Sequence, residues 1–229
     1  MPEGVAALPH YTMIKLIAFD MDGTIYSSEP ILHQSYDVAV KRYNKEYKHN
    51  LKTPNVKEIM KLIGLNPTII YSTLFPELDK QNITFIGRMI LEELCKNIKK
   101  GGGRLLGNIH KFLPELYKRY RLQVVSNGRR EYLKTILEGF ELIRYFSPLR
   151  TVKENESKAE LLKRIMHAES IKPSETIMLG DRANDKEAAV QADVKFIGCN
   201  FTDSDDNEIT DALFVITDYK ELILWLNQQ

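Results

Sequence analysis

Short apolar runs that end near Gly, Asn or Asp recur along the chain. They cover residues 15–20, 122–126, 176–180, 194–198 and 212–216. Helical periodicity, with apolar residues every three or four positions, fills the intervals between the later runs. Strands that alternate with helices are typical of parallel βαβ units. The pattern therefore predicts an α/β protein with a Rossmann-like parallel sheet flanked by helices.

One long interval breaks this alternation and has helical periodicity throughout. It begins after residues 27–30, which read Ser-Ser-Glu-Pro, and ends at the glycine run 101–103. Proline and consecutive glycines favour a hinge over the interior of an element. We therefore expect an α/β core domain formed by residues 1–27 and 103–229. An inserted all-helical cap domain, residues 28–102, would then be able to move over a site on the core.

Composition narrows the classes of function and partner. The 32 Lys and Arg residues balance the 31 Asp and Glu residues, so no bulk charge attracts nucleic acid or an anionic membrane. We expect a small-molecule partner, and the sequence sets no oligomeric state.

The two cysteines, Cys95 and Cys199, have no CxxC spacing, which favours buried thiols in a reducing compartment. The chain has no run of about 18 apolar residues, and its first twenty residues have no signal-peptide pattern. We therefore expect a soluble, cytoplasmic protein.

Polar residues follow three of the predicted strands. They are Asp20 and Asp22 after the first, Ser126, Asn127 and Gly128 after the second, and Asp181 and Asp185 after the third. In open parallel sheets, ligands bind outside the carboxyl ends of the strands, so these side chains are expected to meet there. Clustered carboxylates repel one another unless a cation lies among them. Oxygen ligands favour Mg²⁺ over zinc.

Lys158 is a further candidate, although its position breaks a local rule. Ser157 and Glu160 form a capping-box pattern, which places Lys158 in the first turn of the helix that follows. A cation there opposes the helix dipole by about 0.3–1 kcal/mol. An ammonium group directed at a phosphoryl oxygen and an Asp carboxylate would explain why a cation occupies this unfavourable position. The alternative is a solvated surface lysine.

In this order, the motifs resemble those of the haloacid dehalogenase-like (HAD) phosphohydrolase superfamily. The sequence DMDGT is similar to its first motif, the serine of VVSNG to its second, Lys158 to its third and GDRANDKEAA to its fourth. The helical insertion resembles the cap of the phosphoglycolate phosphatase-like subgroup. The resemblance covers almost the whole chain.

The resemblance implies a role for each acidic residue. Asp20 would be the nucleophile that becomes an aspartyl phosphate, and Asp22 would protonate the leaving alkoxide and later deprotonate the attacking water. Mg²⁺ would be held by the Asp20 carboxylate, the backbone carbonyl of Asp22 and the Asp181 carboxylate. Asp185 would lie behind these ligands or reach the metal through water.

The resemblance also implies a set of groups that stabilise the phosphate. Ser126 and Lys158 would act as catalytic donors, together with backbone amides of the motif loops. The residues expected to bind the substrate phosphate are Gly23, Thr24, Asn127 and Gly128. Thr24 is also expected to hydrogen-bond Asp22 or a loop amide.

Three functions remain open at this point. The first is a Mg²⁺-dependent phosphatase that acts on a small-molecule phosphate monoester such as phosphoglycolate, a sugar phosphate or a nucleotide. The second is a phosphomutase of the β-phosphoglucomutase kind, which returns the phosphoryl group to substrate instead of to water. The third is a non-catalytic binding module on the same fold, which the full set of motifs disfavours.

Overall fold

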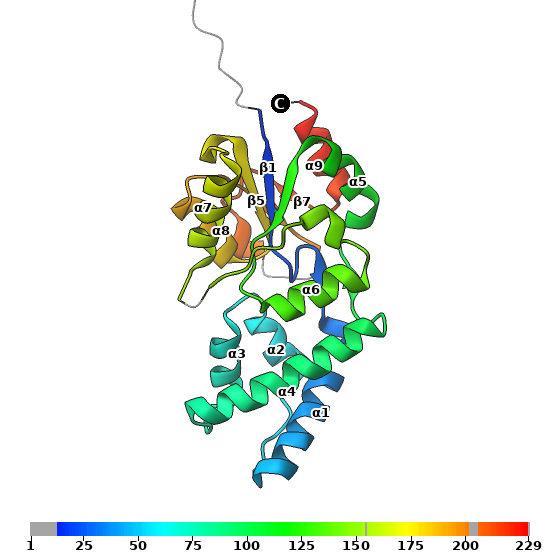
Figure 1. Ribbon diagram of the computed structural model, residues 1–229, viewed down its shortest axis with the longest axis vertical. Helices are drawn as coiled ribbons and strands as arrows, with labels where there is room; N and C mark the ends of the chain where they lie inside the picture. The colour runs from blue at the N-terminus through cyan, green and yellow to red at the C-terminus, as the bar shows by residue number, and fades with distance from the viewer. Residues whose placement is uncertain (1–12, 154, 202–205, 229) are drawn as a thin grey trace, which may run out of the picture.

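A parallel sheet forms the centre of the molecule (Figure 1). The computed structural model describes residues 13–153, 155–201 and 206–228. Within them, the sheet has five strands in the order β4-β1-β5-β6-β7, all pairs parallel. The strands are β1 (Leu16–Phe19), β4 (Arg121–Val124), β5 (Thr176–Gly180), β6 (Lys195–Cys199) and β7 (Val215–Ile216). Each overlaps a predicted run, and the predicted fold class is confirmed.

Helices cover both faces of this sheet (Figure 1). They are α5 (Ile109–Arg119), α6 (Arg130–Gly139), α7 (Lys158–Glu169), α8 (Ala183–Gln191) and α9 (Tyr219–Leu226). Short 3₁₀ helices span Ile143–Phe146, Pro173–Glu175 and Asp206–Ile209. Strand β1 is buried on both faces. Leu16 and Ala18 belong to the cluster that contains α7, whereas Ile17 and Phe19 belong to the cluster that contains α5 and α9. This explains why its sequence is continuously apolar.

The helical interval forms four helices that lie together beyond one end of the sheet (Figure 1). They are α1 (Glu29–Tyr47), α2 (Val56–Leu62), α3 (Pro67–Leu74) and α4 (Lys80–Lys99). Asn55 and Asp79 cap α2 and α4 by accepting backbone hydrogen bonds. Helix α4 packs against both α1 and α6, so it joins the helical interval to the sheet-bearing part of the chain.

A two-stranded antiparallel ribbon connects these helices to the sheet, and the sequence pattern did not indicate it. It consists of β2 (Tyr26–Ser27) and β3 (Arg104–Leu105). The Tyr26 hydroxyl donates to the carbonyl of Gly102, and a side chain on Gly103, whose φ is +84°, would overlap the Tyr26 ring. The glycine run therefore forms a defined turn that leaves room for the Tyr26 side chain. The domain boundaries predicted beside this ribbon stay a prediction.

One apolar core runs from the sheet into the helices. Phe19 and Met21 share a cluster of buried side chains with Leu32, Tyr36 and Ile90 of α1 and α4. The carboxyl end of β1 lies at the point where the strand order reverses, between β4 and β5, which is the usual ligand site of such sheets. The helical interval therefore packs directly over that place.

Three further expectations concern the whole chain. Cys95 and Cys199 are buried free thiols, as predicted. Among the described residues, no helix is both long and apolar enough to cross a membrane. The expectation that the chain begins without a signal peptide falls largely on residues 1–12, which lie outside the described residues.

Candidate active site

The predicted site residues come from four loops at the carboxyl edge of the sheet. Asp20 follows β1 and Ser126 follows β4, while Asp181 follows β5. The capping box predicted at Ser157 is present, and α7 begins at Lys158. The Asp20, Ser126, Asp181 and Lys158 side chains are all buried, although each of them is polar or charged. Their burial is offset by contacts with one another and with Thr24, Gly128 and Asp185.

Lys158 is the centre of a buried ion cluster. Its Nζ lies 2.9 Å from Oδ1 of Asp20 and 2.5 Å from Oδ1 of Asp185. Burial lowers the pKa of Lys158, but the carboxylates of Asp185 and Asp20 raise it by more, so the net pKa is above the ordinary value. Lys158 is therefore held protonated and aimed at Asp20. The surface-lysine alternative is wrong, because only 4% of the side chain is exposed.

Three carboxylates form a group suited to a divalent cation. Oxygens of Asp20, Asp181 and Asp185 lie within 4.8 Å of one another. The second oxygen of Asp20, Oδ2, is buried without a hydrogen-bond partner. Burial and the neighbouring carboxylates raise the pKa of Asp181 well above its ordinary value, and burial raises that of Asp185 to about 6. Mutual repulsion and an orphaned oxygen fit a bound Mg²⁺, which takes oxygen ligands.

Gly23 provides the space for this group. Its φ is +81°, in the left-handed region, and a Cβ built on it would overlap the Asp181 carboxylate. The Thr24 hydroxyl donates to Oδ1 of Asp181 over 3.3 Å and is fully buried. The expected partner of Thr24, which was Asp22 or a loop amide, is therefore wrong. The tight turn after β1 brings Thr24 to a residue 157 positions away in the sequence, which local reasoning does not reveal.

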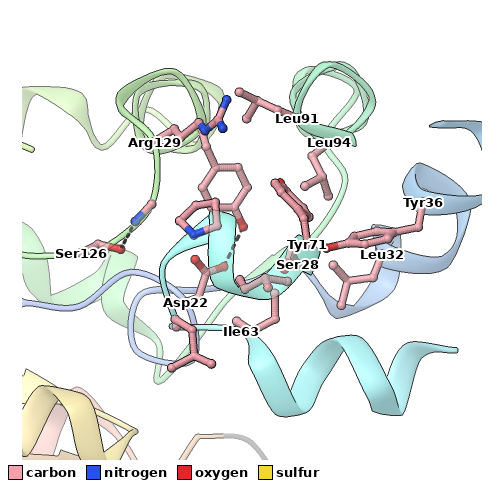
Figure 2. A pocket seen from close by; sticks show the side chains of 16 residues that line it. Asp22, Ser28, Leu32, Tyr36, Ile63, Tyr71, Leu91, Leu94, Ser126 and Arg129 are labelled. Atoms are coloured by element: carbon pink, nitrogen blue, oxygen red, sulfur yellow. Dashed lines mark hydrogen bonds between the residues drawn. The ribbon is translucent and has the colours of Figure 1, made fainter. Parts of the chain in front are cut away.

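Asp22 lies outside the carboxylate group. The Tyr132 hydroxyl donates to Oδ1 of Asp22 over 2.6 Å in a buried contact (Figure 2). Burial raises the pKa of Asp22 to about 7, while the Tyr132 hydrogen bond opposes the rise. A carboxyl group with such a pKa exchanges protons readily at neutral pH. Sequence reasoning missed Tyr132, because it occupies an apolar-periodic position of α6.

The loop after β4 contacts the helical interval as well as the site. Ser126 Oγ accepts a hydrogen bond from the Gly128 backbone amide over 3.2 Å. The Asn127 side chain donates to the carbonyl of Gly64, between α2 and α3, over 2.9 Å. Asn184 donates to the same carbonyl over 2.8 Å. The Asn127 side-chain amide is therefore bound to the helical interval. Any contribution of Asn127 to phosphate binding would come from its backbone amide.

Two cavities open onto Asp22. The first, which we call the apolar pocket, lies between α1, α3, α4 and α6 (Figure 2). Its lining residues include Asp22, Leu32, Tyr36, Tyr71, Leu94 and Arg129. The second, which we call the ionic cleft, has a volume of about 660 Å³ and also reaches Gly23 and Asp181. Its lining cations are Lys57, Lys61, Arg104 and Arg182. Glu29 and Glu208 also line the cleft and pair with Arg104 and Arg182, so its positive charge is partly neutralised.

The fold and the site thus define an α/β protein with a carboxylate–lysine centre at a topological switch point. The sequence profile of the haloacid dehalogenase-like hydrolases matches residues 17–199. The chain belongs to this family. The predicted family is confirmed, and so is the prediction that the chain is an enzyme.

Comparison with individual proteins agrees with this assignment. The chain is 25% identical over 201 residues to phosphoglycolate phosphatase of Vibrio parahaemolyticus, which covers 82% of this chain and 84% of that protein. It is 25% identical over 218 residues to pyrophosphatase PpaX of Oceanobacillus iheyensis, with coverage of 92% and 95%. The names of these relatives support the predicted phosphoric monoester hydrolase.

Solved structures share the fold. A predicted phosphoglycolate phosphatase from Haemophilus somnus superposes with a TM-score of 0.77 at 21% identity and covers 93% of this chain and 97% of that chain. A predicted phosphatase from Clostridium acetobutylicum superposes with a TM-score of 0.76 at 19% identity, with coverage of 95% and 100%. At these identities the structures establish a common fold and leave the substrate to be argued from the site.

Proposed function

We propose that this chain is a Mg²⁺-dependent phosphatase that hydrolyses a small-molecule phosphate monoester through an aspartyl phosphate on Asp20. The observation that carries the proposal is the buried, unpartnered Oδ2 of Asp20, whose other oxygen is held by Lys158. One oxygen is thus oriented by a cation while the other is left without a partner. The family and the names of the phosphatase relatives support the same reaction.

The metal would be held by the residues that cluster in the site. We propose the Asp20 and Asp181 carboxylates and the backbone carbonyl of Asp22 as ligands. Asp185 would lie beside them, since its oxygens accept hydrogen bonds from Lys158 and from the Arg182 backbone amide. When bound, Mg²⁺ neutralises negative charge on the phosphoryl oxygens and on the carboxylates.

In the first step, one oxygen of Asp20 attacks phosphorus, and the bond from phosphorus to the ester oxygen breaks. Lys158 stabilises the charge on the transferring group, with donors from Ser126 and the backbone amides after β1 and β4. Asp22 is protonated at this stage and gives its proton to the leaving alkoxide. Its pKa of about 7 suits this exchange.

In the second step, a water molecule attacks phosphorus of the aspartyl phosphate. Asp22, now ionised, takes a proton from this water, the acyl phosphate bond breaks, and Asp20 is regenerated with release of inorganic phosphate. The Tyr132 hydroxyl holds the Asp22 carboxylate in one orientation through both steps. We further propose that residues 28–102 act as a cap over the site. The free thiols of Cys95 and Cys199 support a cytoplasmic location.

Phosphate release from a panel of monoesters, with Mg²⁺ and with a chelator, tests the proposal. We expect release only with Mg²⁺, and none from the Asp20→Asn variant. The matched control is Asp211→Asn, because 82% of the Asp211 side chain is exposed. Free phosphate distinguishes hydrolysis from the phosphomutase reaction, which yields an isomeric phosphate ester. Substantial turnover by Asp20→Asn would exclude the covalent mechanism.

A further inference from the structure

The apolar pocket opens directly at the proposed acid and base. Asp22 and Ser126 line its catalytic end, whereas Asp20 does not line it. A phosphoryl group bound at Asp20 would therefore direct its leaving oxygen past Asp22 into this pocket. The ionic cleft also opens onto Asp22, but it reaches Gly23 and Asp181 on the side of the carboxylate group. The alcohol half of the substrate is therefore assigned to the apolar pocket, whose chemistry decides which alcohol fits.

The walls of this pocket are largely apolar or neutral, and the charged residues among its described lining are Asp22 and Arg129. Aliphatic side chains form a large part of the lining, among them Leu32, Leu91 and Leu94 (Figure 2). Tyr36 and Tyr71 add hydroxyl groups, and burial raises the pKa of Tyr71 to about 12, so it stays neutral.

Arg129 supplies the one lining cation among the described residues of the apolar pocket. It is an exposed side chain, and Figure 2 shows it beside Leu91, across the pocket from Asp22. A carboxylate carried by the alcohol would lie among leucine and tyrosine side chains, with Arg129 at the exposed rim as the one cation of the described lining. Burying an unpaired charge costs several kcal/mol.

The pocket is also small. The space open to the centre of a water-sized sphere is about 60 Å³, and one water molecule needs about 10–15 Å³ by the same measure. Without movement of its walls, it accepts an alcohol of a few non-hydrogen atoms only.

One wall is fixed by a close contact between two helices. The Tyr71 ring of α3 packs on Gly87 of α4, where a Cβ would lie 2.5 Å from the ring. Glycine in a helix interior costs about 1 kcal/mol relative to alanine. A larger residue at position 87 would displace the ring, so Gly87 sets the depth of the pocket.

From these observations we infer that the alcohol half of the substrate is short and uncharged, and that the apolar pocket discriminates against carboxylate-bearing esters such as phosphoglycolate. The inference rests on the proposed function and names its substrate class. Tyr71, held by Gly87, limits the length of the alcohol.

Two isosteric esters test the charge preference. In 2-phosphoglycolamide a neutral amide replaces the carboxylate of 2-phosphoglycolate, and the shape is kept. We expect kcat/KM for the amide to exceed that for the carboxylate by about a hundredfold, because the carboxylate loses its water among apolar side chains and the one cation of the described lining, Arg129, is at the exposed rim. Equal or better turnover of 2-phosphoglycolate would overturn the inference. Absence of phosphate release from every ester would instead overturn the proposed function.

A glycine substitution tests the length limit. In Gly87→Ala, the displaced Tyr71 ring is expected to lower kcat/KM for n-propyl phosphate by about tenfold relative to methyl phosphate. The matched control is Gly139→Ala, whose Cβ would meet Ile98 at an ordinary 3.6 Å, and it should leave that ratio unchanged. If Gly87→Ala does not fold, Tyr71→Leu gives the opposite readout, a gain for n-propyl phosphate. An unchanged ratio in the folded variant would contradict the length limit.

Discussion

Replacement of Lys158 by methionine isolates the electrostatic core of the site. The substitution keeps an unbranched apolar stem of similar length and removes the ammonium group that contacts Asp20 and Asp185. The two carboxylates are then left buried without their cation, since their side chains are 1% and 0% exposed. The variant therefore measures how strongly the cluster depends on one charge.

The size of the effect follows from this burial. Removing one partner of a buried ion pair costs about 3–5 kcal/mol, because the remaining charge is uncompensated. We expect a loss of this size in the free energy of unfolding, measured by urea denaturation in chelator at neutral pH. The same variant should lower kcat by about 10²–10³-fold, the usual effect of losing one transition-state donor.

A matched exposed pair provides the control. Lys41 lies 2.7 Å from Asp37, but 73% of the Lys41 side chain is exposed. Lys41→Met should cost about 0.3–0.5 kcal/mol and leave kcat unchanged. Adding Asp185→Asn to Lys158→Met should restore part of the lost stability, because it removes one of the uncompensated charges. A loss below about 1 kcal/mol for Lys158→Met, as in exposed pairs, would refute this account of the cluster.

Three further predictions concern the metal, the turn and pH. Mg²⁺ at a hundred times its dissociation constant should stabilise the protein by about 2.7 kcal/mol in calorimetry, and Asp181→Asn should abolish the gain. Gly23→Ala should lower kcat at least about tenfold and weaken Mg²⁺ binding in titrations, because its Cβ overlaps Asp181; unchanged binding would contradict the overlap. The hydrogen bonds from Arg164 lower the pKa of Glu156, so this pair stabilises the fold above the ordinary carboxyl pKa of about 4.3 and loses its effect as pH falls through the lower folded value. Urea melts of Glu156→Gln should therefore show a loss at neutral pH and none near about pH 2; an equal loss at both would contradict the assignment.

The sheet was predictable because its signals are local. Each strand buried on both faces appears as a continuous apolar run, as in β1, and the polar residue that follows it marks the carboxyl edge. The ribbon of β2 and β3 was not predictable, because two-residue strands carry no period. The reason for its glycines is the approach of Tyr26, a contact between positions 76 residues apart.

The site was predictable to the extent that its residues break local rules. Lys158 opposes the dipole of its own helix, and Asp20 ends a buried strand with a charge, so each needs a partner elsewhere. Tyr132 breaks no rule, since it fits the apolar face of α6, and its bond to Asp22 is visible only in three dimensions. A residue such as Tyr132, which fits the pattern expected of its helix and also contacts the site, cannot be recognised as a site residue from a single sequence.

The same reasoning explains why the substrate pocket lies beyond the reach of the sequence. Its wall residues are ordinary core positions of amphipathic helices, and Leu32 and Tyr36 belong to the cluster that also contains Phe19 of β1. Because the pocket is a local gap in one continuous core, its depth depends on how Tyr71 packs on Gly87 rather than on any motif. The proposed reaction thus depends on strand-end motifs that the sequence displays, whereas the proposed choice of alcohol depends on packing that no motif records.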